Sequence, residues 1–441
     1  MNRTEVIREF DKISFGSDEE SQKKFKALQK FLLELSGVAD ADVKNCIRVE
    51  MRYGETFFTA KNYVGLIQVN DDFQIEILPK IDLGGGDNRN EDTKKIFLKM
   101  LRSMKDFPSR IFNNASLKIE RMNIYEIFIN MYLQEVMELV KHGLRSSYVN
   151  LEDNLNFYKG KLVVNQHIKA NLAHQERFYV AFDMFHHDRP ENRLVKATLE
   201  ILSKRTHSAE NSKIIRQLLT IFDLVKSSTN YERDFSKVVL DRSTRDYEYL
   251  MQWAKVFLLN KSFSTFSGIT TSKALLFPMQ SVYERYVAQQ IKRVFVPKGW
   301  EVITQKVEKY LSEAPEVFQL KPDIVLKRRN GNTIITIIMD TKWKETNLSN
   351  KNCGISQGDM YQMYAYSKKY KAQNVWLLYP ITEEIRKYGE EKDKIKFVSE
   401  TDKNESDRTT IRVHFIDFKD TLTDDLNANL EELAKKIKST S

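Results

Sequence analysis

Two acidic residues and a lysine in the last third of the chain have the types and spacing that phosphodiester hydrolysis needs. Asp323 follows Pro322 at the start of an apolar run, and Lys342 lies two residues after Asp340. Hydrolysis of a phosphodiester requires a cation that neutralises the phosphate and lowers the pKa of an attacking water. Magnesium prefers carboxylate oxygens, and a nearby lysine can position the water or help to deprotonate it. These three residues therefore predict a magnesium-dependent nuclease site.

The turn between the two acidic residues predicts that all three side chains share one face. Asn330-Gly331 is a favoured centre for a two-residue hairpin turn of type I′. Counting outward from that turn places Asp323 opposite Ile338. Because cross-strand partners share a face and strands repeat every two residues, this register brings both aspartates and the lysine together.

The alternative is that the two aspartates only terminate strands and that the lysine is a solvated edge residue. Short Asp-x-Lys matches are common by chance, so the spacing alone does not decide between the two interpretations. Asp340, however, directly follows the almost wholly apolar run Ile334 to Met339. A charge next to a buried strand is usually paired or bound to a metal, which favours the functional interpretation.

Two neighbouring segments supply further candidates. Glu284 on the preceding helix is a possible third carboxylate and metal ligand, with a surface ion pair as the equal alternative. Gln362 and Tyr366 are four residues apart and share one face of a helix, where they could contact the phosphate or the base beside the cut. Alternatively, Tyr366 packs that helix on the sheet together with Tyr361 and Tyr364.

The elements that must position these residues predict a mixed α/β domain over residues 266–441. A helix is expected at Met279 to Val294 and another at Gln357 to Tyr370. Strands are expected at about 301–308, 316–328, 333–343, 374–379 and 411–418, followed by a final helix. Helices that alternate with strands around an internal hairpin describe a compact mixed α/β domain.

The first part of the chain predicts two more domains. In residues 1–93, a helix at 18–36 precedes strands, and Tyr63 to Val69 and Phe73 to Leu78 flank Asn70-Asp71-Asp72 as a hairpin. Residues 94–265 are mainly helical in period, apart from a hairpin-like piece from Phe157 to Val164. The predicted fold class is multidomain α+β, with an N-terminal β-rich module, a helical middle region and the C-terminal mixed α/β domain.

The composition fits a protein that binds a polyanion. Seventy basic and 61 acidic residues give a net charge of +9, and Lys and Arg release counterions from phosphate. The two cysteines, Cys46 and Cys353, form neither a disulfide framework nor a zinc motif, which fits a reducing cytosol. Charged residues interrupt the most apolar helical stretch, Ile124 to Val140, so it cannot span a bilayer. A cytoplasmic protein without a membrane partner is expected.

The site residues resemble a known motif series. Pro322-Asp323, Asp340-Thr341-Lys342 and Gln362-x-x-x-Tyr366 look like the motifs of PD-(D/E)XK nucleases. Most of the chain resembles McrC, the nuclease subunit of McrBC-type modification-dependent restriction systems. The segments that carry this likeness are 63–67, 75–80, 158–162, 182–184, 192–196 and 359–366. The resemblance implies a PD-(D/E)XK domain that cuts DNA with Mg²⁺, for which Mn²⁺ can substitute. The McrC family does not always carry an acid where Glu284 stands.

The same resemblance implies a partner, an McrB-like AAA+ GTPase that forms a hexameric ring. That ring would recognise modified cytosine and translocate DNA, while this chain stimulates GTP hydrolysis and makes the cut. The chain has no phosphate-binding loop of its own, because Gly84-Gly85-Gly86 lacks the Lys-Ser/Thr ending. The hairpin from Tyr63 to Lys80 is the predicted contact with the ring's channel, although such hairpins as often serve only their own core. A stand-alone nuclease and a non-catalytic adaptor that activates an AAA+ partner remain alternatives.

Overall fold

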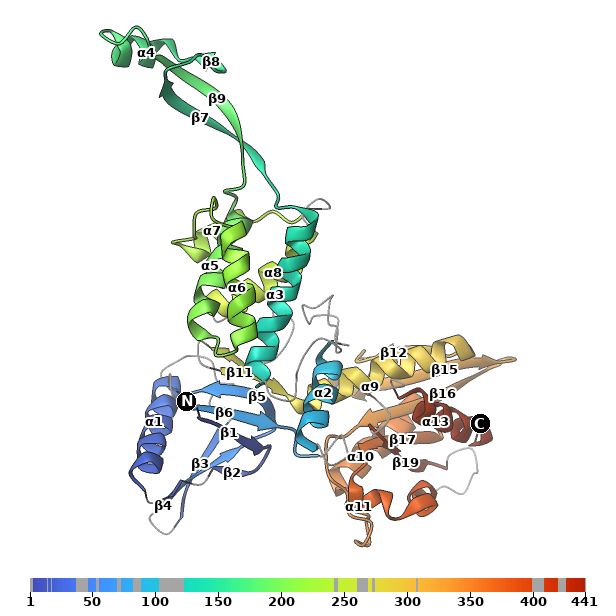
Figure 1. Cartoon of the computed structure of the whole chain (residues 1–441). Helices are drawn as coiled ribbons and strands as arrows, with labels where there is room; N and C mark the ends of the chain where they lie inside the picture. The colour runs from blue at the N-terminus through green and yellow to red at the C-terminus, as the bar shows by residue number, and fades with distance from the viewer. Residues whose placement is uncertain are drawn as a thin grey trace.

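The computed structural model describes residues 3–13, 15–16, 18–36, 47–52, 55–69, 73–81, 89–102, 123–241, 245–259, 269–271, 274–306, 308–398, 408–418 and 426–440. Over these residues the chain is a mixed α/β structure with several sheets (Figure 1). Cys46, the predicted hairpin tip Asn70-Asp71-Asp72 and the glycine run Gly84-Gly85-Gly86 lie outside the described residues.

Two sheets and a helix build the N-terminal module. The smaller sheet has the order β2-β4-β3, with β2 at Lys12–Ile13, β3 at Ile47–Arg52 and β4 at Glu55–Ala60. The larger has the order β1-β6-β5-β11-β10, with β1 at Arg3–Arg8, β5 at Tyr63–Gln68, β6 at Phe73–Leu78, β10 at Ile269–Thr271 and β11 at Ala274–Pro278. Helix α1 (Glu19–Ser36) buries Leu28 and Phe31 against these sheets. The predicted helix at 18–36 and the hairpin of β5 with β6 are confirmed.

Strand β11 is where the structure departs from the predicted domain boundary at residue 266. That boundary placed β10 and β11 in the C-terminal domain, whereas both strands complete the N-terminal sheet. The pairing depends on Gly65 in β5, because a Cβ at this position would lie 2.1 Å from the carbonyl oxygen of Leu275. Leu276 is fully buried in the core of the module. The N-terminal sheet therefore runs directly into the helix that follows Pro278.

The middle region is mainly helical, as its period predicted. Its helices include α2 (Arg89–Arg102), α3 (Ile124–His142), α5 (Pro190–Arg205) and α6 (Ala209–Ile221), joined by α7 (Tyr231–Lys237) and α8 (Tyr247–Leu259). Helix α3 is buried on most of its surface, and its Glu126 accepts hydrogen bonds from Thr206 Oγ1 at 2.7 Å and His207 N at 2.6 Å. In the described part of the chain, no helix combines the length and apolar character needed to cross a membrane.

A long two-stranded ribbon leaves this helical body (Figure 1). Strands β7 (Ser147–Leu155) and β9 (Phe178–His186) pair along their full length, and residues 156–177 form the ribbon tip with β8 (Lys161–Leu162) and α4 (Val164–Asn171). The predicted hairpin-like piece, Phe157 to Val164, is only part of this tip. Strand β7 was not predicted because its residues 151–155 have no buried side chain and therefore no apolar alternation.

The C-terminal domain is a six-stranded sheet with helices on its faces. The strand order is β12-β15-β16-β17-β19-β18, with β16-β17 and β17-β19 parallel and the other pairs antiparallel. The strands are β12 (Glu301–Thr304), β15 (Ile324–Asn330), β16 (Thr333–Thr341), β17 (Asn374–Pro380), β18 (Lys396–Val398) and β19 (Thr410–Ile416). The helices are α9 (Met279–Phe295), α10 (Gln357–Tyr370), the short α11 (Glu383–Arg386) and α13 (Asn427–Thr440), with 3-10 turns at Val296–Lys298 and Gly389–Lys394.

One predicted strand of this domain is divided in two. Residues 316–328 form β14 (Glu316–Leu320), which pairs with β13 (Lys309–Glu313), and then β15 in the main sheet. Pro322 lies in the break between them and has no N–H to donate to a strand ladder. The break places Asp323 at the beginning of β15, at the edge where the candidate site is built.

Candidate nuclease site

The hairpin formed by β15 and β16, named the catalytic hairpin after its proposed role, brings the two predicted aspartates together. Ile324 pairs with Met339, so the next position along the same register sets Asp323 opposite Asp340. Directly opposite residues in an antiparallel pair have Cβ atoms about 4.5–5.5 Å apart. The two carboxyl groups therefore start from neighbouring positions on one face of the sheet.

The register of this hairpin differs from the predicted one. Its central turn residues are Gly331 and Asn332, one position later than expected, and Gly331 has a φ of +59°. A glycine with positive φ suits the first central position of a tight hairpin turn. The predicted pairing of Asp323 with Ile338 is therefore wrong. Because the change moves the partner by two residues, to Asp340, the side chain of Asp323 keeps the predicted face.

Asp323 is held by the residue that follows Asp340. Its Oδ2 accepts hydrogen bonds from the backbone N and from Oγ1 of Thr341, each at 2.7 Å. Burial, and after it the charge of Glu284, raise the pKa of Asp323 to about 7 against the opposing effect of the hydrogen bonds from Thr341. A cation placed next to Asp323 would therefore stabilise the ionised form of its carboxyl group.

Asp340 is the most buried of the acidic residues in this site, with 2% of its surface exposed. Burial raises its pKa to about 7, and the charge of Asp323 acts in the same direction. Its Oδ2 lies 2.6 Å from Nζ of Lys342, yet no hydrogen bond of good geometry reaches this buried oxygen. Asp340 thus presents an incompletely satisfied oxygen to the interior of the site.

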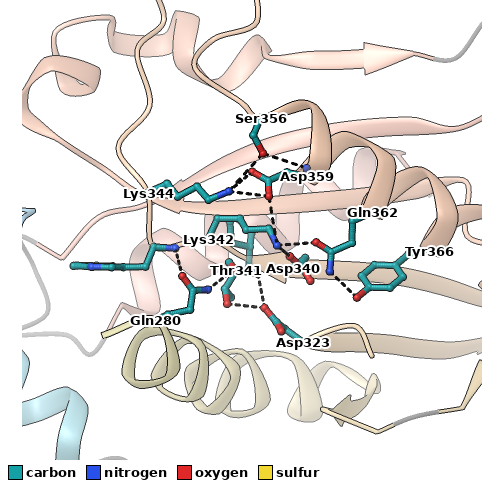
Figure 2. A network of polar contacts seen from close by, with 12 residues as sticks. Gln280, Asp323, Asp340, Thr341, Lys342, Lys344, Ser356, Asp359, Gln362 and Tyr366 are labelled. Carbon is teal, nitrogen blue, oxygen red and sulfur yellow. Dashed lines mark hydrogen bonds and ion pairs between the residues drawn. The ribbon is translucent and has the colours of Figure 1, made fainter. Parts of the chain in front are cut away.

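Lys342 links the aspartates to helix α10 (Figure 2). Its Nζ donates to Oε1 of Gln362 at 2.8 Å, and Nε2 of Gln362 donates to the hydroxyl of Tyr366 at 2.8 Å. Burial acts to lower the pKa of Lys342, but the carboxylates of Asp340, Asp359 and Asp323 raise it overall, so the ammonium stays charged. The predicted pair Gln362 and Tyr366 is therefore part of the site.

The tyrosines of α10 divide between the two predicted roles. Tyr366 is 4% exposed and packs on the sheet, as the structural alternative proposed, while its hydroxyl orients Gln362. Burial raises the pKa of Tyr366 to about 12, so it remains a neutral partner. Tyr361 and Tyr364 are 65% and 40% exposed and do not pack in this way.

Glu284 comes from helix α9, whose path begins in the N-terminal sheet. It is half-buried, lies within hydrogen-bond contact of the carboxyl group of Asp323, and accepts a hydrogen bond from the side-chain amide of Gln305. The predicted alternative was a surface ion pair with Lys or Arg. The structure instead places Glu284 against Asp323, which makes it a candidate for the third carboxylate of the site.

Three polar residues beside Lys342 were not predicted as site residues. Asp359 is 6% exposed, its carboxylate accepts from Nζ of Lys344 at 2.8 and 2.9 Å, and it lies 3.7 Å from Nζ of Lys342. Ser356 caps α10 through the backbone N of Asp359. Burial opposes ionisation of Asp359, but Lys344 and Ser356 hold its pKa below the usual value. The two-residue repeat from Asp340 through Lys342 to Lys344 was the available sequence signal.

The donor set fits a hard divalent cation, although it is not arranged to hold one as it stands. Within the described ranges, no three His, Cys, Asp or Glu side chains form a ready metal-binding group. Lys342 Nζ takes the place of a cation beside Asp340, and Thr341 occupies Oδ2 of Asp323. The donors are all carboxylate oxygens, which Mg²⁺ prefers, and Oδ2 of Asp340 makes no hydrogen bond of good geometry that a bound ion would have to displace. Asp323, Asp340 and Glu284 are the residues that fit such an ion.

Comparison with known proteins now gives the family. The sequence profile of the family described as "McrBC 5-methylcytosine restriction system component" matches residues 58–380, which span all three regions of the chain. This chain belongs to that family. A search of curated proteins gave no match. The resemblance inferred from the nuclease motifs and the middle segments is therefore confirmed.

Two solved structures from Thermococcus gammatolerans share the fold with this McrBC-family chain. One is a refined half-complex from a tetradecameric assembly of McrB AAA+ hexamers with bound McrC. It matches with a TM-score of 0.72 and 20% identity, over 98% of this chain and 100% of that chain. The other is the cryo-EM structure of the McrBC complex, with a TM-score of 0.51 and 20% identity, over 66% of this chain and 88% of that one. At this identity the likeness shows a common fold.

Proposed function

We propose that this chain is the nuclease subunit of an McrBC-type restriction system and hydrolyses DNA through a PD-(D/E)XK site. The observation that carries the proposal is the convergence of Asp323, Asp340 and Lys342 at one edge of the catalytic hairpin, with Glu284 completing the acidic group. Two buried carboxyl groups with raised pKa values are costly to keep side by side for stability alone. Such a cluster is characteristic of a site that binds a cation.

Each residue has a role that follows from its contacts. Asp323 and Asp340 would hold Mg²⁺, with Glu284 as a third ligand, and Mn²⁺ would substitute because it accepts the same oxygen donors. When bound, the ion supplies charge neutralisation at the phosphate and a lower pKa for water. Lys342, which donates to Gln362 at 2.8 Å, would be the residue that positions the attacking water once the ion takes over the charge of Asp340. Gln362 and Tyr366 fix the direction from which the ammonium group approaches.

The partner is proposed from the family and from the T. gammatolerans complex. There, McrC is bound to McrB AAA+ hexamers, and the shared fold covers 98% of this chain. We propose that this chain likewise docks on an McrB-like AAA+ GTPase ring, stimulates its GTP hydrolysis and cuts DNA that carries modified cytosine. The McrBC description of the family supports the choice of modified cytosine.

The ribbon is a better candidate for the ring contact than the hairpin predicted from the sequence. The predicted hairpin, from Tyr63 to Lys80, forms the middle of a five-stranded sheet, and its described side chains are mostly buried. This burial favours the alternative, in which the described strands serve the core of their own domain. By contrast, the ribbon of β7 and β9 projects from the helical body (Figure 1). Its tip exposes the apolar side chains of Phe157, Tyr158, Val164, Ile168 and Leu172.

A cleavage assay with separate components tests this function against its alternatives. The purified chain is incubated with DNA containing 5-methylcytosine, with and without an McrB-like partner, GTP and Mg²⁺. Cleavage is expected only with partner, GTP and Mg²⁺ or Mn²⁺, and excess EDTA should stop it. Cleavage by the chain and Mg²⁺ alone would favour a stand-alone nuclease. GTPase stimulation without cleavage under any condition would favour a non-catalytic adaptor.

A further inference from the structure

The residue after the proposed catalytic lysine is held by the N-terminal module. Trp343 directly follows Lys342, is 3% exposed, and donates from Nε1 to Oε2 of Glu9 at 2.9 Å. Glu9 follows strand β1 and lies 334 residues away in the sequence. The same Oε2 accepts from the backbone N of Lys80 at 3.1 Å, at the end of β6. The carboxylate of Glu9 in the N-terminal module thus holds the indole ring of Trp343 in the C-terminal domain.

Helix α9 holds the other side of this segment. Gln280 accepts from the backbone N of Trp343 at 3.0 Å and donates to the carbonyl oxygen of Thr341 at 3.1 Å. These two bonds clamp the backbone on either side of Lys342. Gln280 lies four residues before Glu284, so one face of α9 carries both the clamp and the third carboxylate.

Both supports originate in the N-terminal sheet. Strand β11 pairs with β5 and continues without a break into α9, and the backbone N of Met279 donates to the carbonyl oxygen of Asn62 at 3.2 Å. Glu9 and Lys80 lie just beyond the ends of β1 and β6, strands of the same sheet. Any displacement of that sheet relative to the nuclease sheet is therefore transmitted to Trp343 from two directions.

We propose that Glu9 is a positioning residue for cleavage, which acts by holding Trp343 and thereby the segment that carries Asp340 and Lys342. The assignment rests on the proposed nuclease function. Its consequence is that the catalytic segment is correctly placed only while the N-terminal module is in place. A shift of the module when the chain docks on a partner can therefore alter cleavage without any contact between the module and DNA.

The surroundings of Glu9 support this role. It is 2% exposed, and its Oε1 is buried without a hydrogen-bond partner. Burial raises its pKa to about 7, with the bonds from Trp343 and Lys80 opposing the rise. A buried carboxyl group with one unsatisfied oxygen destabilises the fold, so a purely structural position would be better filled by an apolar side chain.

The test uses the full chain with its partner, GTP, Mg²⁺ and DNA. Trp343→Phe removes the N–H donor and keeps a ring against Tyr283, whose ring centroid lies 5.3 Å from that of Trp343. Glu9→Ala removes the acceptor, and Glu9→Gln keeps an acceptor oxygen. Trp343→Phe and Glu9→Ala are expected to lower turnover at saturating DNA roughly tenfold, with KM for DNA unchanged, because small misplacements of catalytic groups are costly. Glu9→Gln should restore most of the rate.

A double mutant and a matched control separate positioning from general destabilisation. The Glu9→Ala/Trp343→Phe protein should be no slower than the slower single variant, since both remove the same bond. Lys94→Met breaks another ion pair beside the same sheet, Lys94 Nζ to the buried Glu76 at 2.7 Å, and should lower Tm without lowering turnover. Additive losses, an equal loss in Lys94→Met, or parental turnover in Trp343→Phe would overturn the assignment. A parent protein that cuts no DNA would instead refute the proposed function.

Discussion

The catalytic hairpin and the ribbon are both antiparallel pairs of strands, but one buries charged side chains and the other exposes apolar ones. The catalytic hairpin lies in the middle of a sheet, where Asp340 is buried directly after the apolar residues of β16 and pairs with Lys342. The ribbon leaves the body of the protein and exposes apolar residues such as Leu172 at its tip, where no core covers them. Buried charge and exposed apolar surface are each unfavourable for folding. Each therefore indicates a ligand, a cation for the hairpin and a protein surface for the ribbon.

The largest expected effect concerns the buried charge. Asp340→Ala should lower DNA cleavage by roughly 10³-fold or more, on the scale of removing a catalytic group. GTPase stimulation of the partner should be unchanged, because Asp340 lies away from the ribbon. Cleavage is measured on methylated DNA and GTP turnover on the same samples. Asp323→Asn should behave in the same way, since the amide keeps the shape and removes the charge that a hard cation needs. Full cutting by either protein would contradict the assignment of the site.

A smaller effect is expected from charges placed on the exposed apolar tip of the ribbon. This effect should appear in partner binding and not in the nuclease site itself. Ile168→Asp and Leu172→Asp place charges on a tip where the side chains are 54% and 80% exposed, so the fold should tolerate them. Loss of an interface anchor of about 2 kcal/mol would weaken partner binding by roughly thirtyfold. Leu224→Asp is the matched control, because Leu224 is 77% exposed and lies outside the ribbon. Unchanged partner binding by the tip variants would show that the ring contact lies elsewhere.

The sequence was informative where one face of an element is buried, and uninformative elsewhere. The catalytic hairpin has such a face, so its period placed Asp323, Asp340 and Lys342 correctly even though the turn was set one residue too early. Residues 151–155 of the ribbon have no buried side chain, so their pattern carried no strand signal. A register inferred from a turn is only as accurate as the choice of the two central turn residues, which here was one position too early.

Contacts between distant segments could not be predicted at all. Strand β11 pairs with β5, which lies about two hundred residues earlier in the chain. The local sequence pattern of Ala274 to Pro278 does not indicate which strand it pairs with. The bond from Trp343 to Glu9 is of the same kind. For this reason a fragment that ends at residue 265, the predicted end of the middle domain, would lack β10 and β11 of the N-terminal sheet.

The smallest effect is expected from loss of the Tyr366 hydroxyl group, which orients Gln362, the hydrogen-bond acceptor of Lys342. Tyr366→Phe removes the acceptor for Nε2 of Gln362 and keeps the ring packed on the sheet. Gln362 can then turn its amide, and Lys342 loses a fixed acceptor. A single neutral hydrogen bond contributes about 0.5–1.5 kcal/mol, so cleavage should fall roughly two- to tenfold.

The outcome of that substitution decides whether α10 contributes to catalysis or only covers the sheet. Tyr364→Phe is the control, because Tyr364 lies on the same helix and is 40% exposed. Gln362→Ala should lower cleavage at least as much as Tyr366→Phe, and the double variant should add little, since both act through the same contact with Lys342. Equal cleavage by the Tyr366→Phe and Tyr364→Phe proteins, with Gln362→Ala also at the parental rate, would reduce α10 to a packing element. The catalytic group would then consist of the hairpin and Glu284 alone.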